Sequence, residues 1–192
     1  SWTDKNVKSG KYFKYTVKAC DGSKRSAYDK TGAKSLFLTT PTVSYANTKT
    51  GIKISWNKVA AAKSYVIYRA EYINGKWTSW KNVGTCSNTT VYCVDKGVES
   101  GITYRYTVRA VNGDYRSAYK TVAGLKFLTE PTVTVKTATN GIKLSWDKSE
   151  GAGNYIVYRR EYNDYNKKWS SWTQLTTVTT RSYTDKNAVA GK

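Results

Sequence analysis

The residues of this chain that could do chemistry are aromatic rings, a repeated aspartate and three cysteines. The sequence contains no histidine, which is the commonest general base and triad partner. Asp4, Asp95 and Asp185 recur in the same TDK or VDK context, and a residue repeated in every unit more often builds a turn than a single active site. No base partner is visible for a serine or cysteine nucleophile. We therefore expect a protein without enzymatic activity and without a cofactor.

An internal repeat organises these residues. Pro41, Trp56 and Tyr68 recur 90 positions later as Pro131, Trp146 and Tyr158. Residues 1–38 match residues 91–128, and residues 182–192 match the beginning of that segment. The sequence thus divides into the later part of one repeat (1–38), a complete repeat (39–128) and the earlier part of a third (129–192).

Each repeat shows the signals of short strands. Ile52, Ile54 and Trp56 alternate with polar residues, and the stretches YVIYRAEY (65–72) and WTSWKNV (77–83) are separated by Asn74-Gly75. An Asn-Gly pair between two such stretches indicates a type I′ hairpin turn. About seven short strands in ~90 residues, without helical periodicity, predict an all-β fold of tandem antiparallel β-sandwiches.

The repeat resembles a fibronectin type III domain, which is an immunoglobulin-like sandwich. The matching features are Pro41, Trp56, Tyr65-x-Ile67 and the Gly101-x-x-Tyr104-x-Tyr106-x-Val108-x-Ala110 pattern. The lysine-rich and tyrosine-rich style also resembles repeats in surface proteins of Gram-positive gut bacteria. This resemblance implies an extracellular or cell-surface location and a role in adhesion or spacing.

The two incomplete repeats lack the strands that would cover their apolar faces. Two interpretations are open. The C-terminal part of one chain could be completed by residues 1–38 of another chain, head to tail, or the sequence could be a section of a longer array with frayed ends.

The aromatic residues outside the expected core are the candidate binding site. In the fibronectin pattern Tyr65 and Ile67 point inward, which leaves Tyr68 and Tyr72 outside. Trp77 and Trp80 are three apart on an expected strand, so we expect them to point to opposite faces. Such residues could stack on sugars or anchor a protein partner, although shielding of the sheet is the more ordinary explanation. The full candidate set is Tyr68, Tyr72, Trp77, Trp80, Tyr158, Tyr162, Trp169 and Trp172.

The three cysteines point to different roles. Cys20 aligns with Val111, which predicts a buried free thiol. Cys86 and Cys93 lie in a connection that is longer than its counterpart in the next repeat, and a disulfide between them would staple it. Three cysteines without histidine cannot supply a convincing four-ligand zinc site, so no metal is expected.

The charge balance points to anionic partners. The chain has 32 Lys and Arg against 13 Asp and Glu, a formal net charge of +19. Anionic wall polymers or acidic glycans fit this field, whereas no nucleic-acid recognition motif and no membrane-inserting stretch is visible. We expect non-catalytic adhesion or spacer modules. Two alternatives are binding of a host protein, such as an immunoglobulin or mucin glycoprotein, through the 66–80 and 156–172 hairpins, and a carbohydrate-binding module accessory to an enzyme.

Overall fold

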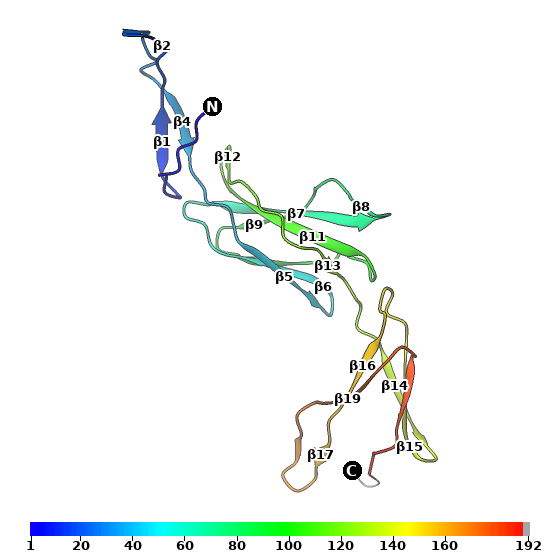
Figure 1. The fold of residues 1–192 in the computed structure, drawn as a ribbon. Coiled ribbons are helices and arrows are strands. Elements are labelled where there is room, and N and C mark those ends of the chain that lie inside the picture. The colour runs from blue at the N-terminus through cyan, green and yellow to red at the C-terminus, as the bar shows by residue number, and fades with distance from the viewer. Residues whose placement is uncertain (190–192) are drawn as a thin grey trace. The chain divides into compact units, whose positions relative to one another are not determined.

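A computed structural model describes residues 1–189, and every regular element in that range is a β-strand (Figure 1). The chain separates into two compact units, one made of residues 1–98 and 103–125 and the other of residues 99–102 and 126 onward. Residues 1–189 contain no helix long and apolar enough to cross a membrane. The division of the sequence into three repeats stays a prediction, because the contacts group the N-terminal part with the complete repeat.

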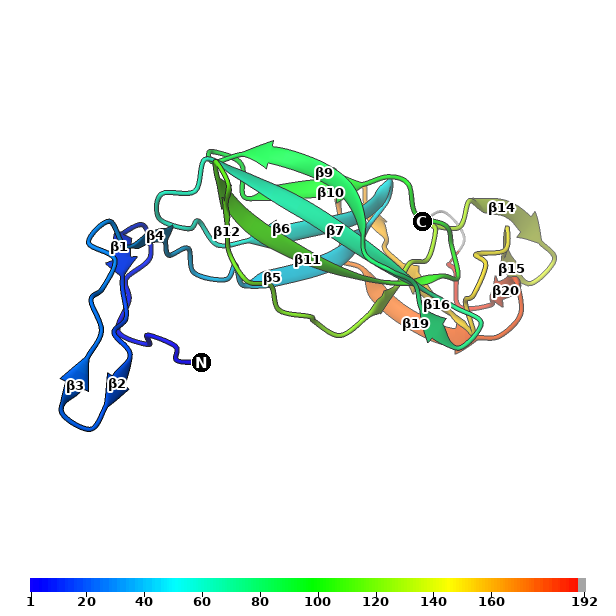
Figure 2. The ribbon, with the colours of Figure 1, turned by 90° about the horizontal axis from the view of Figure 1, so that it is seen from above.

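The complete repeat forms two antiparallel layers (Figures 1 and 2). The smaller sheet has the order β10-β6-β5. The larger sheet has the order β12-β11-β7-β8, with β9 also paired to β7 and β13 to β11. This arrangement confirms the predicted all-β sandwich. The strands are β5 (Val43–Thr48), β6 (Gly51–Trp56), β7 (Ser64–Ile73), β8 (Lys76–Trp77), β9 (Lys81–Ser87), β10 (Tyr92–Asp95), β11 (Thr103–Asn112), β12 (Tyr115–Arg116) and β13 (Leu125–Lys126).

The core lies between the two layers and follows the period-2 pattern of the sequence. Ile52, Ile54 and Trp56 of β6 are buried, as are Tyr65 and Ile67 of β7. This confirms both predicted inward faces. Strand β11 closes the core with four buried side chains at alternate positions, Tyr104, Tyr106, Val108 and Ala110.

The turn between β7 and β8 has the predicted geometry. Asn74 and Gly75 both have positive φ angles, 50° and 77°, as a type I′ turn requires. The expected strand 77–83 is not continuous, however, because β8 ends at Trp77 and β9 begins at Lys81.

A buried ion pair joins the two layers. The Arg69 guanidinium of β7 donates to the Asp95 carboxylate of β10 at 2.9 Å, and the Tyr106 hydroxyl of β11 donates to the same oxygen at 3.1 Å. The side chains of Arg69 and Asp95 are only 10% and 9% exposed. Arg69 also pairs with Glu71 at 2.7 Å, and it is buried because it alternates on β7 with the inward Tyr65 and Ile67 and finds a counter-charge in Asp95.

The pKa shifts of Arg69 and Tyr106 favour the protonated forms that bind Asp95. Burial alone would lower the pKa of the Arg69 guanidinium, but the hydrogen bond and charge of Asp95, with the charge of Glu71, outweigh it and raise that pKa. Burial, followed by the charge of Asp95, raises the pKa of the Tyr106 hydroxyl well above its usual value. Arg69 therefore stays charged and Tyr106 stays a donor.

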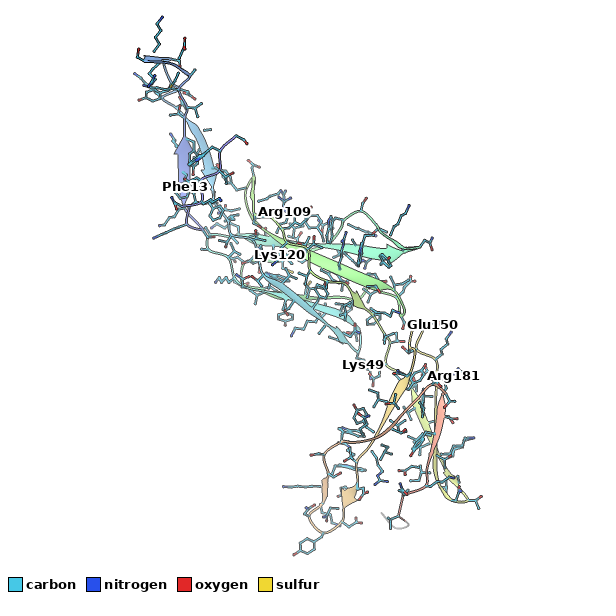
Figure 3. The ribbon with its side chains drawn as sticks, in the orientation of Figure 1. Phe13, Lys49, Arg109, Lys120, Glu150 and Arg181 are labelled. Atoms are coloured by element: carbon cyan, nitrogen blue, oxygen red, sulfur yellow. The ribbon has the colours of Figure 1, made fainter. Side chains whose placement is uncertain are left out.

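The N-terminal part forms two small hairpins. Strand β1 (Tyr12–Tyr15) pairs with β4 (Ala33–Leu36), and β2 (Cys20–Asp21) pairs with β3 (Lys24–Arg25). Phe13 lies on β1 (Figure 3). Cys20 is exposed, so the prediction of a buried thiol is wrong; no second layer covers this hairpin within the described residues.

The second unit repeats the earlier strands of the sandwich. Strands β14, β15 and β20 form one sheet, β16 pairs with β19, and β17 pairs with β18. Among the described residues, no strand takes the place that β11 has beside β7. The bounds are β14 (Val133–Ala138), β15 (Gly141–Trp146), β16 (Tyr155–Arg159), β17 (Tyr162–Asn163), β18 (Lys168–Trp169), β19 (Thr173–Val178) and β20 (Ser182–Asp185).

We predict that Asp95→Ala destabilises the complete repeat by about 3–5 kcal/mol, because it leaves the buried Arg69 charge without its partner. Urea unfolding measures the loss. Asp185→Ala is the matched control: Arg159 also binds Asp185 at 2.9 Å, but its side chain is 31% exposed and can be solvated. Each loss is measured on the unfolding of the unit that carries the substitution, and equal losses in the two units would contradict this account.

Candidate functional site

The outward face of the larger sheet carries a layer of alternating aromatic and arginine side chains. Strand pairing places Thr103 opposite Tyr72, Arg105 opposite Ala70 and Thr107 opposite Tyr68. Because directly opposed residues point to the same face, these outward positions form one continuous surface. Trp77 continues it, since β8 places this residue opposite Tyr72.

Two tryptophans enclose one arginine at the centre of this face. The Arg105 guanidinium carbon lies 4.3 Å from the centre of the Trp77 ring and 5.0 Å from that of Trp80. We call Trp77, Arg105 and Trp80 the first clasp. Its geometry is that of two cation–π contacts to a single cation. The Arg105 Nε is buried without a hydrogen-bond partner, so ring stacking rather than hydrogen bonding holds this end of the side chain.

The expectation that Trp77 and Trp80 point to opposite faces is wrong. Strand alternation would separate them, but the strand is interrupted between Trp77 and Lys81. The intervening residues bend, so that Thr78 and Glu71 exchange hydrogen bonds: the Thr78 amide donates to the Glu71 carbonyl and the Glu71 amide to the Thr78 hydroxyl. Both tryptophans consequently reach the same arginine.

Further rings extend the first clasp at both ends. The Tyr72 and Trp77 ring centres are 5.1 Å apart, and those of Trp80 and Tyr119 are 6.1 Å apart. Arg109 of β11, labelled in Figure 3, lies with its guanidinium carbon 5.7 Å from the Tyr119 ring centre. Arg105 therefore links two pairs of contacting rings, Tyr72–Trp77 and Trp80–Tyr119, and Arg109 contacts the last of these rings.

The second unit builds the same clasp from a different residue. Arg160 lies 4.9 Å from the Trp169 ring centre and 4.7 Å from that of Trp172. In the complete repeat the aligned residue is Ala70, which lies opposite Arg105. We call Trp169, Arg160 and Trp172 the second clasp; its arginine comes from the segment between β16 and β17 rather than from a β11-like strand.

The predicted site residues are brought together only in part. Tyr162 packs against Trp169 with ring centres 5.2 Å apart, as Tyr72 does against Trp77. Tyr68 and Tyr158 lie opposite Asn82 and Gln174 and outside the clasps. Trp169 and Trp172 are 55% and 62% exposed, whereas Trp77 and Trp80 are half-buried.

Sequence reasoning missed the arginines. The usable signal was present: Arg105 and Arg109 alternate with buried positions on β11, and Arg160 replaces Ala70 in an otherwise repeated segment. Strand alternation by itself places such cations only on the solvent side of the sheet. The structure shows that they cover the rings, because a flat guanidinium can stack on an aromatic face without losing its charge.

Lysines cover other rings in the same way. Lys18 lies 4.6 Å from the Tyr28 ring centre and Lys34 lies 4.2 Å from that of Tyr12. Lys53 lies 4.8 Å from the Tyr92 ring centre. Much of the exposed aromatic surface is therefore already in contact with a cation of the same chain.

Cys86 and Cys93 approach each other at one edge of the sandwich. Cys86 lies opposite the inward Tyr65, and Cys93 lies opposite the inward Ile54, so both thiols point between the sheets. Both are free thiols in the structure, and a hydrogen bond links their side chains. Burial, followed by the charges of Cys86 and Asp95, raises the pKa of the Cys93 thiol to about 12.

The second unit has larger residues at the positions equivalent to Cys86 and Cys93. Val178 lies opposite Tyr155, and Tyr183 lies opposite Leu144, in the registers that Cys86 and Cys93 occupy. A valine and a tyrosine thus close the edge there, whereas two smaller cysteines do so in the complete repeat. A covalent bond would compensate for the lost packing, and the disulfide stays a prediction.

Within residues 1–189 no group of three or more His, Cys, Asp or Glu is placed to hold a metal ion. Asp95 is engaged by Arg69 and Tyr106, and Asp185 by Arg159. The repeated aspartates of these two repeats therefore have a structural task.

Comparison with known proteins finds a relative that matches only part of this chain. No protein-family model matches the chain. A poly(3-hydroxybutyrate) depolymerase of Ralstonia pickettii is 42% identical over 67 residues, which are 35% of this chain. The match spans only 12% of the length of that curated relative.

Solved structures similar to the chain include fibronectin type III domains. An Fn3-like protein from Clostridium thermocellum is 25% identical over 46% of this chain and 92% of its own, with a TM-score of 0.37. The chicken interferon gamma receptor alpha chain is 16% identical over 73% of this chain and 82% of its own, with a TM-score of 0.40. The strand pairing, rather than these scores, defines the sandwich.

We predict that Arg105→Gln destabilises the complete repeat by about 1–2 kcal/mol, because two desolvated cation–π contacts are lost while the planar amide keeps most of the packing. Urea unfolding followed by circular dichroism measures the change. Arg116→Gln removes one charge from an exposed hairpin and is the matched control. A loss no larger than that of the control would refute a structural role for the clasp.

We also predict that equilibration in a buffer of oxidised and excess reduced glutathione leaves one free thiol in the denatured protein, because Cys86 and Cys93 join with release of two reduced glutathione molecules while excess reduced glutathione returns the exposed Cys20 to the free thiol. Thiol titration measures the number. Cys86→Val should leave two free thiols under the same treatment. Three titratable thiols in the unsubstituted protein would rule out the disulfide.

Proposed function

We propose that the chain consists of non-catalytic modules of a larger extracellular protein, which space its parts and adhere to anionic surfaces. The sandwich fold is typical of such modules, although the fold alone assigns no task. The proposal includes a bacterial surface protein as the parent and an anionic wall polymer or acidic glycan as the partner.

One observation carries this proposal: the rings of the outward faces are covered by cations of the same chain. In the first clasp the Arg105 guanidinium lies over both Trp77 and Trp80, which leaves less of these half-buried rings available to a sugar. What remains available to a partner is the excess of hydrated positive charge, +19 overall. Such a field attracts polyanions without a specific pocket.

The positive charge is concentrated on the N-terminal hairpins. Between residues 11 and 34 the only acids are Asp21 and Asp29. The same stretch carries seven cations, all of them exposed, namely Lys11, Lys14, Lys18, Lys24, Arg25, Lys30 and Lys34. We therefore place the strongest polyanion attraction there.

A second candidate is a module accessory to a polymer-degrading enzyme. The depolymerase match favours it, since a short segment of that enzyme resembles this chain while most of the enzyme does not. In this case the exposed rings of Trp169 and Trp172 would contact the insoluble polymer.

We predict that binding of the 192-residue chain to heparin, a soluble polyanion probe, falls steeply as salt rises, because exposed charges are screened. Replacing Lys11, Lys24 and Lys30 together by Gln should weaken binding about tenfold, if each contributes roughly 0.5 kcal/mol. The control replaces the exposed Lys63, Lys76 and Lys81, which changes the net charge equally.

Each alternative is tested by a binding measurement of its own. Sedimentation with poly(3-hydroxybutyrate) granules that persists at high salt and is lost in Trp172→Ala would favour the accessory module. Salt-resistant binding of an immunoglobulin or mucin glycoprotein would favour a host-protein interface on the 66–80 and 156–172 hairpins. Absence of heparin binding at low salt would overturn the proposal.

A further inference from the structure

The second unit holds an open apolar groove. Val133, Val135, Leu144, Trp146 and Val157 line a cavity of about 820 Å³. Val133 and Val135 are 50% and 60% exposed, whereas Val43, which aligns with Val133, is 8% exposed. The described residues leave this groove uncovered at the place where the complete repeat is closed.

The complete repeat shows what closes such a groove. Strand β11 pairs with the edge of β7, and its Tyr106 ring packs against Tyr45 of β5 with ring centres 5.5 Å apart. Tyr45 lies opposite Ile54, as Val135 lies opposite Leu144, so Val135 stands where Tyr45 does. The missing cover is therefore a strand with the pattern of β11.

The N-terminal part of the same sequence carries that pattern. Tyr15, Val17 and Ala19 align with Tyr106, Val108 and Ala110, which are fully buried. Tyr15 and Val17 are instead 37% and 86% exposed. Strand β1 pairs only with β4 among the described strands, so its other edge is open. Exposed apolar residues along an open edge are a ready template for pairing with another chain.

We propose that residues 12–38 of one chain close the second unit of another copy, with β1 added to the open edge of β16. The register follows from the complete repeat, where Tyr106 lies opposite Arg69 and Val108 opposite Ile67. It places Tyr15 opposite Arg159 and Val17 opposite Val157. This is strand addition, in which main-chain hydrogen bonds and alternate side-chain pockets act together.

Polar groups at the groove fit this register. Arg159 binds Asp185 at 2.9 Å, as Arg69 binds Asp95, but no tyrosine hydroxyl of the second unit donates to Asp185 in the hydrogen bonds described. Tyr15 supplies the position of Tyr106. Its hydroxyl now donates to Asp4, the copy of Asp95 in its own segment, at 3.1 Å. On docking, the Tyr15 hydroxyl would leave Asp4 of its own chain and donate instead to Asp185 of the other copy, which holds the same position in its repeat.

The second clasp does not need an arginine from the donor strand. The donor has Lys14 where β11 has Arg105, and the acceptor already fills its clasp with Arg160. Lys14 would lie opposite Arg160, and like charges directly opposed weaken pairing. Screening by salt should therefore strengthen the association, which is the opposite of the effect expected on polyanion binding.

The contact is heterologous, since a donor surface meets a different acceptor surface. Two chains that exchange segments would form a closed dimer, and chains that do not close would form an open row. Both outcomes depend on the same docking, and both are measured without a polyanion, so failure of the docking can be told apart from failure of the polyanion proposal.

Sedimentation equilibrium of the 192-residue chain tests this proposal over a wide range of concentration at low and high salt. We expect a mass above that of the monomer, rising with concentration and with salt. Val17→Asp and Val135→Asp should each weaken association about a hundredfold or more, because each would bury an unpaired charge. Both residues are exposed in the separate chain, so neither substitution should impair folding.

Mixing the two variants gives the decisive measurement. Val17→Asp keeps an intact acceptor and Val135→Asp an intact donor, so the mixture should form a 1:1 complex although each variant alone stays monomeric. Tyr165→Asp alters a residue that is 98% exposed on another hairpin, and it should leave association unchanged. A monomeric mass of the unsubstituted chain at every concentration, or association that survives both substitutions, would overturn the proposal.

Discussion

The pairing of β11 with β7 is the constraint on which the complete repeat depends. Strand β7 is buried on its inner face and offers a long edge, and β11 satisfies that edge along nine opposed residue pairs from Thr103–Tyr72 to Val111–Ser64. The same strand delivers Tyr106 to Asp95 and Arg105 to the tryptophans. One strand therefore closes the core, completes the buried ion pair and fills the first clasp. Beside β16, where the described residues supply no such strand, an apolar groove remains.

The two faces of the larger sheet shield their apolar and aromatic side chains from water in different ways. The inner face buries aliphatic and tyrosine side chains against β6, where water is excluded. On the outer face, arginine side chains cover the rings, and the Arg105 Nε is itself buried beneath them. This explains how a chain rich in both Tyr and Lys can present aromatic strands without a large bare apolar patch. It also leaves positive charge as the most general feature that the surface offers to a partner.

The fold was accessible from the sequence because strand alternation and internal repetition are local properties. Ile52, Ile54, Tyr65 and Ile67 could be assigned to the core from period-2 spacing and the resemblance, and Asn74-Gly75 could be assigned to a turn from residue type. The candidate site was accessible only in part. Alternation placed Trp77 and Trp80 on opposite faces, but a strand break lies between them, and period-2 spacing has no meaning beyond the end of a strand.

The sequence by itself determined that the chain repeats a β-sandwich unit, that it is strongly basic, and which residues alternate into its core. Only the tertiary structure decided that Arg69 is buried, that Cys86 and Cys93 face each other between the sheets, and that Arg105 and Arg160 occupy equivalent clasps from different positions. The physical reason is that these outcomes depend on which strands are neighbours. A charged side chain enters the interior only where a strand distant in sequence offers a counter-charge, and a slot between two rings accepts whichever cation the adjoining backbone can deliver.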